Sequence, residues 1–111
     1  IRDGGAIGLW DMAFNPTPSS DSHWCQNFGH LGTGIPHAIG AQLAVGDTRR
    51  VVLVSGDSAF QFHIAELETA VRKNLPIVCI VGPTGNGKTG LSLDLADLRM
   101  GTGVQSGSFW S

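Results

Sequence analysis

The sequence has few charged residues, and they do not gather in one place. Only 14% of the 111 residues are charged, and the formal net charge is -2. The basic residues form just two adjacent pairs, Arg49-Arg50 and Arg72-Lys73. Binding to nucleic acid or to an anionic membrane surface requires a concentrated basic patch. The composition therefore predicts no nucleic-acid partner and no membrane partner.

Long apolar runs and cysteines are also scarce. No run approaches the roughly 18 apolar residues of a membrane-spanning helix, and no signal peptide is recognisable. The two cysteines, Cys25 in a polar loop and Cys79 in an apolar run, do not form a metal-type cluster. We therefore predict two free thiols and a cytoplasmic location. Because Ile1 is not a natural first residue, we also expect the chain to be a piece of a longer protein.

Apolar residues and glycines are plentiful by contrast. Apolar residues make up 41% of the chain, and there are 16 glycines, many of them clustered beside apolar runs. This balance predicts one globular domain that occupies residues 1–111. The glycine clusters indicate tight turns and close approach of the backbone to a ligand.

The order of elements predicts the fold class. Helical spacing of apolar residues alternates with short β-branched runs, in the order helix 35–45, strand 51–54, helix 64–73, strand 77–81 and a helix marked by Leu91, Leu95 and Leu98. In the first helix, Ile35, Ala38, Ile39 and Leu43 are expected on the buried face. Strand–helix–strand units form parallel pairs. We therefore predict a small three-layer α/β unit with a short parallel sheet.

Glycine turns follow both predicted strands, at residues 55–58 and 82–87. Ligands of open parallel sheets bind at the carboxyl ends of the strands, so both turns should lie at the same edge. In the first turn, Gly56-Asp57-Ser58 offers backbone N–H groups for phosphate oxygens and a carboxylate for Mg²⁺. An ordinary strand-to-helix turn, capped by Asp57 or Ser58, is the alternative interpretation.

The surrounding sequence is more specific than this tripeptide. Residues 28–36 read Phe-Gly-His-Leu-Gly-Thr-Gly-Ile-Pro, and residues 51–59 read Val-Val-Leu-Val-Ser-Gly-Asp-Ser-Ala. Together with the rest of 28–81, they resemble the diphosphate-binding domain of thiamine diphosphate-dependent enzymes. Acetolactate synthase, benzoylformate decarboxylase and oxalyl-CoA decarboxylase form the nearest group. The Asp3-Gly4-Gly5 segment is more loosely similar to the segment upstream of that domain.

The resemblance implies a role for each matching residue. Asp57 would bind Mg²⁺, and Gly56 with the amides of Ser58 and Ala59 would face the diphosphate. Leu31 would support the bent cofactor, and the carbonyl of Gly29 would meet its aminopyrimidine. A plain core role for Leu31 remains an alternative. His30 could contact a substrate, although an exposed position is the simpler expectation.

The chain departs from the family after the second strand. The family has two consecutive asparagines there, whereas this chain has Pro83 and Thr84. Thr84 would then be a poorer metal ligand, and the carbonyl of Asn86 would be another. The family's catalytic glutamate belongs to a separate pyrimidine-binding domain, and the complete site forms between two subunits. We therefore expect the chain alone to be inactive.

A second phosphate-binding motif starts where this resemblance ends. Residues 82–89, Gly-Pro-Thr-Gly-Asn-Gly-Lys-Thr, match the P-loop pattern G-x-x-x-x-G-K-[ST]. Lys88 would reach the β- and γ-phosphates of ATP or GTP, Thr89 would hold Mg²⁺, and the amides around Gly82, Gly85, Asn86 and Gly87 would surround the phosphates. Residues 80–96 are similar to the opening of isopentenyltransferases.

Three functional hypotheses follow. The chain could be a fragment of a thiamine diphosphate-dependent decarboxylase or carboligase, acting in the intact enzyme on a 2-oxo acid or an acyl-CoA. It could instead be a P-loop nucleotide-binding module, or a non-catalytic designed scaffold. Because the two resemblances meet at Val81, we further hypothesise a junction there, as in a chimera.

Overall fold

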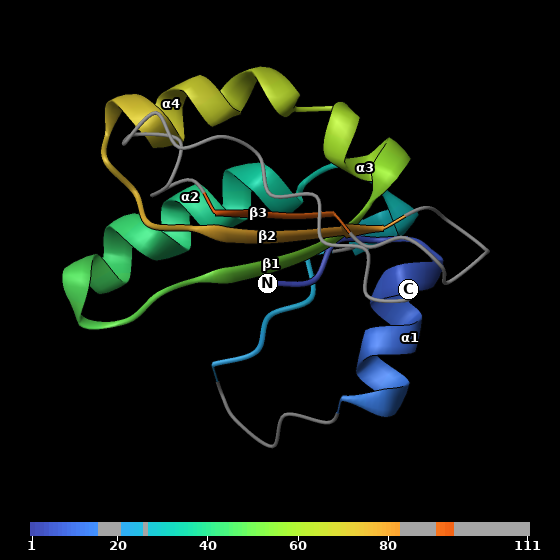
Figure 1. Ribbon diagram of the computed structural model, residues 1–111. Helices are drawn as coiled ribbons and strands as arrows, with labels where there is room; N and C mark the ends of the chain where they lie inside the picture. The colour runs from blue at the N-terminus through green and yellow to red at the C-terminus, as the bar shows by residue number, and fades with distance from the viewer. Residues whose placement is uncertain (16–20, 26, 83–90, 95–111) are drawn as a thin grey trace, which may run out of the picture.

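The computed structural model describes residues 1–15, 21–25, 27–82 and 91–94. Helices and strands alternate through this part of the chain (Figure 1). In order, the elements are α1 (Ala6–Phe14), η1 (Asn27–Gly29), α2 (Gly34–Val45), η2 (Gly46–Thr48), β1 (Val52–Gly56), α3 (Asp57–Gln61), η3 (Ile64–Glu66), α4 (Leu67–Arg72), β2 (Val78–Gly82) and β3 (Leu91–Asp94).

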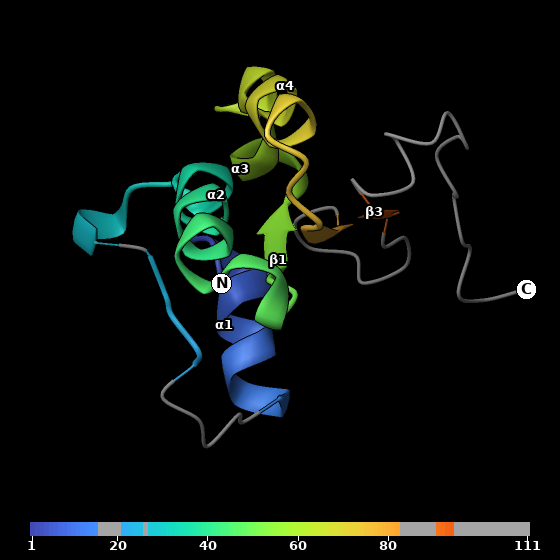
Figure 2. The same ribbon diagram turned by 90° about the vertical axis from the view of Figure 1, so that its left-hand side faces the viewer.

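The sheet has the strand order β1-β2-β3, and β1 and β2 run parallel. Val52 lies opposite Val78 and Gly56 opposite Gly82, so the two strands end side by side. The predicted α/β fold with a strand–helix–strand crossover is thus confirmed, with α3, η3 and α4 forming the connection. Helix α4 lies on one side of the strands and α1 on the other (Figures 1 and 2).

Strand β3 corrects one prediction. Residues 91–94 form a strand that pairs antiparallel with β2, from Val78 opposite Asp94 to Val81 opposite Leu91. The helix predicted from Leu91 is therefore wrong over these four residues. Leu95 and Leu98, the other two marks of that helix, lie outside the described residues.

Helix α2 buries a different set of residues from the one predicted. Ile35, Ala38 and Ile39 are buried as expected, but Leu43 is 56% exposed and Gln42 is buried in its place. A helix turns by about 100° per residue, so Gln42 returns to within about 20° of Ile35, whereas Leu43 points about 80° away. The geometry of the helix therefore places an amide in the core and a leucine at its margin.

Residues 1–3 extend the sheet along the outer edge of β1. The Ile1 ammonium donates to the Val52 carbonyl at 2.8 Å, the Val54 amide donates to Ile1, and the Asp3 amide donates to Val54, both at 2.9 Å. This parallel ladder places Asp3 beside the carboxyl end of β1. The core next to it comprises Ile35, Ala38, Ile39, Leu53, Phe60, Ala70, Leu75, Ile77, Cys79 and Val81.

Neither cysteine forms a disulfide, as predicted, and both are buried. The Cys25 thiol donates to the Arg2 carbonyl at 3.0 Å. Burial raises the pKa of the Cys25 thiol above its ordinary value, because a thiolate would lose its hydration there. No helix in the described part of the chain is long and apolar enough to cross a membrane.

Gly34, the first residue of α2, lies so close to Asp3 and Leu53 that no side chain fits there. A Cβ atom at Gly34 would lie 2.6 Å from Asp3 Oδ2 and 2.7 Å from Leu53 Cδ1, whereas one at Gly40 would meet nothing within 4 Å. We expect Gly34→Ala to lower the free energy of unfolding by about 1–3 kcal/mol. Gly40→Ala should raise it by about 0.5–1 kcal/mol. Urea unfolding followed by circular dichroism measures both, and equal stabilities of the two variants would contradict the packing described.

Candidate cofactor site

The Gly56-Asp57-Ser58 turn lies where the sequence predicts it, at the carboxyl end of β1. β1 ends with Gly56, and α3 begins with Asp57. The Asp57 side chain is half-buried; its Oδ1 accepts from the Ser58 amide at 2.8 Å and lies 3.5 Å from the Ser58 hydroxyl. Ser58 is exposed, whereas Ala59 is buried. The turn thus presents a carboxylate and a hydroxyl at the edge where β1 and β2 end.

The second half of the predicted metal site cannot be placed. Thr84 and Asn86 lie outside the described residues, two and four positions after Gly82. In the described ranges, no group of three or more His, Cys, Asp or Glu side chains could hold a metal ion. A Mg²⁺ site built from one carboxylate with hydroxyl, carbonyl and phosphate oxygens needs no such group. Among the described residues, Asp57 can supply the one carboxylate that such a site requires.

The P-loop residues are likewise described only at their first position. Gly82 is buried at the end of β2, opposite Gly56. Its other members, Gly85, Asn86, Gly87, Lys88 and Thr89, lie outside the described residues. The strand expected before the motif is present, and it ends at the same edge as β1.

The other two predicted cofactor residues are Gly29, the last residue of η1, and Leu31, in the loop between η1 and α2. Gly29 is exposed, has a φ of 69°, and would meet nothing within 4 Å if it carried a Cβ. Leu31 is half-buried, and its Cδ2 lies 3.8 Å from the position of a Cβ on Gly5. His30 between them is exposed, as expected. This loop is open on the side of Gly29.

Gly32 joins the loop to α3. It has a φ of 92°, and a Cβ there would lie 2.4 Å from Phe62 Cβ and 3.2 Å from the Ala59 carbonyl oxygen. The His63 ring nitrogen Nδ1 lies 2.5 Å from the Gly32 carbonyl oxygen. The loop with Leu31 and the helix that starts at Asp57 are therefore in direct contact. His63, the N-cap residue of η3, therefore contacts this loop directly.

Asp3 lies beside the candidate site, and the sequence did not single it out. Its side chain is fully buried, and its carboxylate accepts from four groups. These are the amides of Gly4 at 2.7 Å, Gly32 at 3.0 Å and Gly34 at 3.0 Å, and the Ser55 hydroxyl at 3.2 Å. The signal available was the Asp3-Gly4-Gly5 segment, whose loose similarity to the family assigned no role to Asp3.

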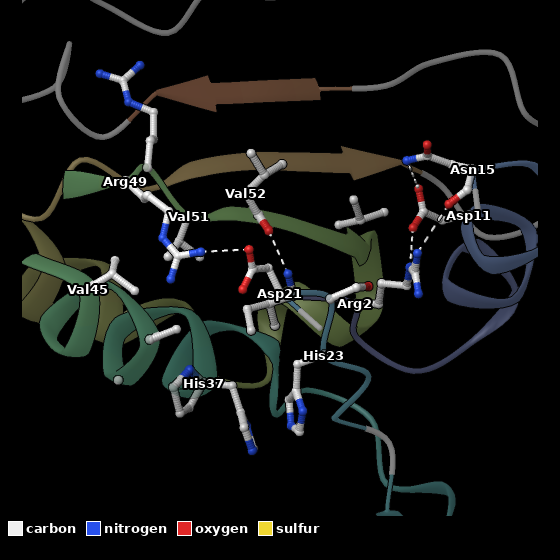
Figure 3. A pocket seen from close by; sticks show the side chains of 17 residues that line it. Arg2, Asp11, Asn15, Asp21, His23, His37, Val45, Arg49, Val51 and Val52 are labelled. Carbon is white, nitrogen blue, oxygen red and sulfur yellow. Dashed lines mark hydrogen bonds and ion pairs between the residues drawn. The ribbon is translucent and has the colours of Figure 1, made fainter. Parts of the chain in front are cut away.

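A hollow of the described surface lies away from these residues. A cavity of about 950 Å³ follows the outer edge of β1 and is lined by Ile1, Arg2, His23, His37, Val45 and Arg49, among others. Figure 3 shows Arg49 paired with Asp21, and Arg2 beside Asp11 and Asn15. Burial lowers the pKa of the Ile1 ammonium in this hollow. None of the predicted cofactor residues lines it, so this cavity is not the candidate site.

Comparison with known proteins points to one family. Residues 3–92 match the family described as thiamine pyrophosphate enzyme, C-terminal TPP binding domain. This match continues past Val81, where the sequence suggested a junction. The similarity to isopentenyltransferases does not appear among these matches. No solved structure gives a significant match.

Individual relatives agree with this match. The acetolactate synthase large subunit of Porphyra purpurea is 38% identical over 81 residues, which are 71% of this chain and 13% of that protein. Oxalyl-CoA decarboxylase of Escherichia coli strain K12 is 39% identical over 72 residues, 65% of this chain and 12% of that protein. 2-Hydroxyacyl-CoA lyase 1 of Mus musculus is 47% identical over 58 residues, 50% of this chain and 10% of that protein. The chain thus spans only about an eighth of the length of the relatives it matches.

Proposed function

The chain belongs to the thiamine pyrophosphate enzymes, as part of their C-terminal TPP binding domain, and from this membership we propose that the carboxyl ends of β1 and β2 hold the diphosphate and Mg²⁺ of thiamine diphosphate. The observation that carries the proposal is the position of Asp57. Its carboxylate starts α3 at the end of a parallel strand, the edge at which such sheets bind ligands.

Each described residue has a task in this proposal. Asp57 binds Mg²⁺ through its carboxylate, and Gly56 lets the diphosphate approach the backbone. With the cofactor bound, the amides of Ser58 and Ala59 would donate to phosphate oxygens, the Ser58 amide in place of its hydrogen bond to Asp57. The Ser58 residue is exposed beside them. Thr84 and Asn86 complete the metal coordination from the segment after β2.

The organic part of the cofactor lies toward the loop with Gly29 and Leu31. Leu31 would pack against the bound cofactor and support its bent shape, while the Gly29 carbonyl would accept from the aminopyrimidine. When bound, thiamine diphosphate supplies carbanion stabilisation. In the full-length protein we place a 2-oxo acid or an acyl-CoA as substrate, since the relatives include an acetolactate synthase and an oxalyl-CoA decarboxylase.

We further propose that another protein surface covers α1 and that the isolated chain is inactive. On helix α1 the exposed fractions of Leu9, Trp10 and Phe14 are 51%, 62% and 74%. The rings of Trp10 and Phe14 stack with their centroids 5.1 Å apart. Contiguous exposed apolar side chains mark surfaces that another protein surface covers. A pyrimidine-binding domain or a second subunit would cover α1 and supply the catalytic glutamate.

Titration calorimetry of the 111-residue chain tests the cofactor. We expect thiamine diphosphate to bind in the presence of Mg²⁺, and Asp57→Ala to weaken binding about 100-fold or more, because even residues that only support a metal ligand are worth 10–100-fold. Asp47→Ala is the matched control, since Asp47 is an exposed carboxylate of η2. Binding to the Asp57→Ala variant with unchanged affinity would refute the metal-binding role.

A second candidate, nucleotide binding, rests on the complete P-loop pattern that starts at the end of β2. The same titration with ATP or GTP and Mg²⁺ distinguishes the two functions. Nucleotide binding that is lost in Lys88→Ala would favour the P-loop, and binding of neither ligand would favour a scaffold.

A further inference from the structure

The carboxylate of Asp3 touches both halves of the candidate cofactor site. We propose that Asp3 is a positioning residue that fixes the Leu31 loop, residues 29–34, relative to the metal-binding turn, residues 56–58. The inference rests on the proposed function, because it assigns the two segments to the two ends of one cofactor. Asp3 itself is fully buried and would not contact the cofactor.

On the loop side, Asp3 accepts from two amides. Oδ1 accepts from Gly32 and Oδ2 from Gly34, each at 3.0 Å. Gly32 follows Leu31 directly, and its carbonyl oxygen lies 2.5 Å from His63 Nδ1. Both backbone polar groups of Gly32 thus have a side-chain partner, the amide in Asp3 and the carbonyl in His63. Leu31 therefore has an anchored neighbour on the side that leads into α2.

On the turn side, Asp3 is attached twice. The Ser55 hydroxyl donates to Oδ2 at 3.2 Å, and the Asp3 amide donates to the Val54 carbonyl at 2.9 Å. Ser55 is fully buried and lies two residues before Asp57. Oδ2 accepts from both Gly34 and Ser55, so one oxygen atom joins the loop to the strand end.

The buried carboxylate of Asp3 strengthens the hydrogen bonds that join the Leu31 loop to the end of β1. A buried carboxylate is very unfavourable without partners, so it holds its four donors strongly. The close approach also requires glycine, because a Cβ at Gly34 would lie 2.6 Å from Oδ2. The Gly32-Thr33-Gly34 sequence and Asp3 are therefore matched to each other.

Two ligands separate positioning from general support of the fold. Thiamine diphosphate would contact both the Leu31 loop and the Asp57 turn, whereas inorganic pyrophosphate with Mg²⁺ would contact the turn alone. If Asp3 sets the separation of the two segments, its loss should weaken the first ligand and spare the second. A purely structural residue would affect both ligands alike.

The experiment compares Asp3→Asn with Asp11→Asn in the 111-residue chain. Asn keeps the size of Asp but removes the charge and points an NH₂ group at backbone amides. Asp11 is the control because its carboxylate pairs with Arg2 and accepts from the Asn15 side chain, both outside the two segments. We expect Asp3→Asn to raise the Kd of thiamine diphosphate about 10–100-fold, the range for residues that support a site, with the pyrophosphate Kd unchanged. Asp11→Asn should change neither.

Equal weakening of both ligands, or no weakening of either, would overturn the proposal. If Asp3→Asn does not fold, Ser55→Ala removes a single donor and is judged by the same two titrations. Amide hydrogen exchange without ligand gives an independent reading, since exchange at Gly32 and Gly34 should accelerate in Asp3→Asn. A wild-type chain that binds neither ligand would refute the proposed function, while the exchange rates would still decide whether Asp3 holds the loop.

Discussion

Replacing Leu53 with Ala is expected to lower the free energy of unfolding by about 3–5 kcal/mol, the upper part of the range for such truncations. Leu53 is fully buried as the second residue of β1 and lies opposite Cys79 of β2. Its Cδ1 lies against Gly34 of α2, so the side chain fills the contact between the strand and this helix. Because a small domain has only about 5–15 kcal/mol in total, the variant should be partly unfolded at moderate temperature.

Val52→Ala is the control for this prediction. Val52 precedes Leu53 in the same strand, but its side chain points to the opposite face and is 42% exposed. We expect the control to lose no more than about 1 kcal/mol, because little apolar area becomes exposed. Chemical unfolding monitored by circular dichroism measures both variants. If Leu53→Ala were as stable as Val52→Ala, the core would be centred elsewhere.

Gln42→Leu is the second large effect, at about 2–4 kcal/mol of lost stability. The Gln42 amide nitrogen donates to the carbonyls of Gly46 at 2.7 Å and Arg49 at 2.8 Å, and its oxygen accepts from the Val51 amide at 2.8 Å. Leucine fills a similar volume but leaves these three backbone groups without their partner. Each buried polar group left unsatisfied costs about 1–3 kcal/mol, reduced where water reaches it.

The matched control here is Gln61→Leu, since Gln61 is exposed at the end of α3. Its stability should stay within about 0.5 kcal/mol of the wild type, as for most surface substitutions. Thermal unfolding of both variants checks the difference. A Gln42→Leu variant more stable than the wild type would mean that apolar packing outweighs the three hydrogen bonds.

Local patterns in the sequence were sufficient for the parallel core of the fold. Helix α2 and the strands β1 and β2 follow from apolar periodicity and from β-branched runs, and their glycine ends fix where they stop. β3 was missed because Leu91-Ser92-Leu93-Asp94 fits alternation as well as helical spacing. Pairing with β2 decides between the two, and no local pattern contains that information.

In the candidate site, too, some residues could be predicted from local sequence and others could not. Gly56, Asp57 and Ser58 could be found because they are adjacent and follow a strand. Asp3 and His63 could not, because their partners lie far away in sequence: Gly32 is 29 residues from Asp3 and 31 from His63. A buried aspartate before two glycines looks like any turn until the fold brings its donors together.

The same separations have a consequence for how the chain folds. Asp3 closes loops of 29, 31 and 52 residues through Gly32, Gly34 and Ser55. Closing such loops costs conformational entropy before the long-range contacts can form. Local helices such as α2 should therefore form earlier during folding than the Asp3 contacts. We expect the Asp3 contacts to be completed in the last cooperative step. The cofactor would then bind only the fully folded chain, and partly folded chains would not bind it.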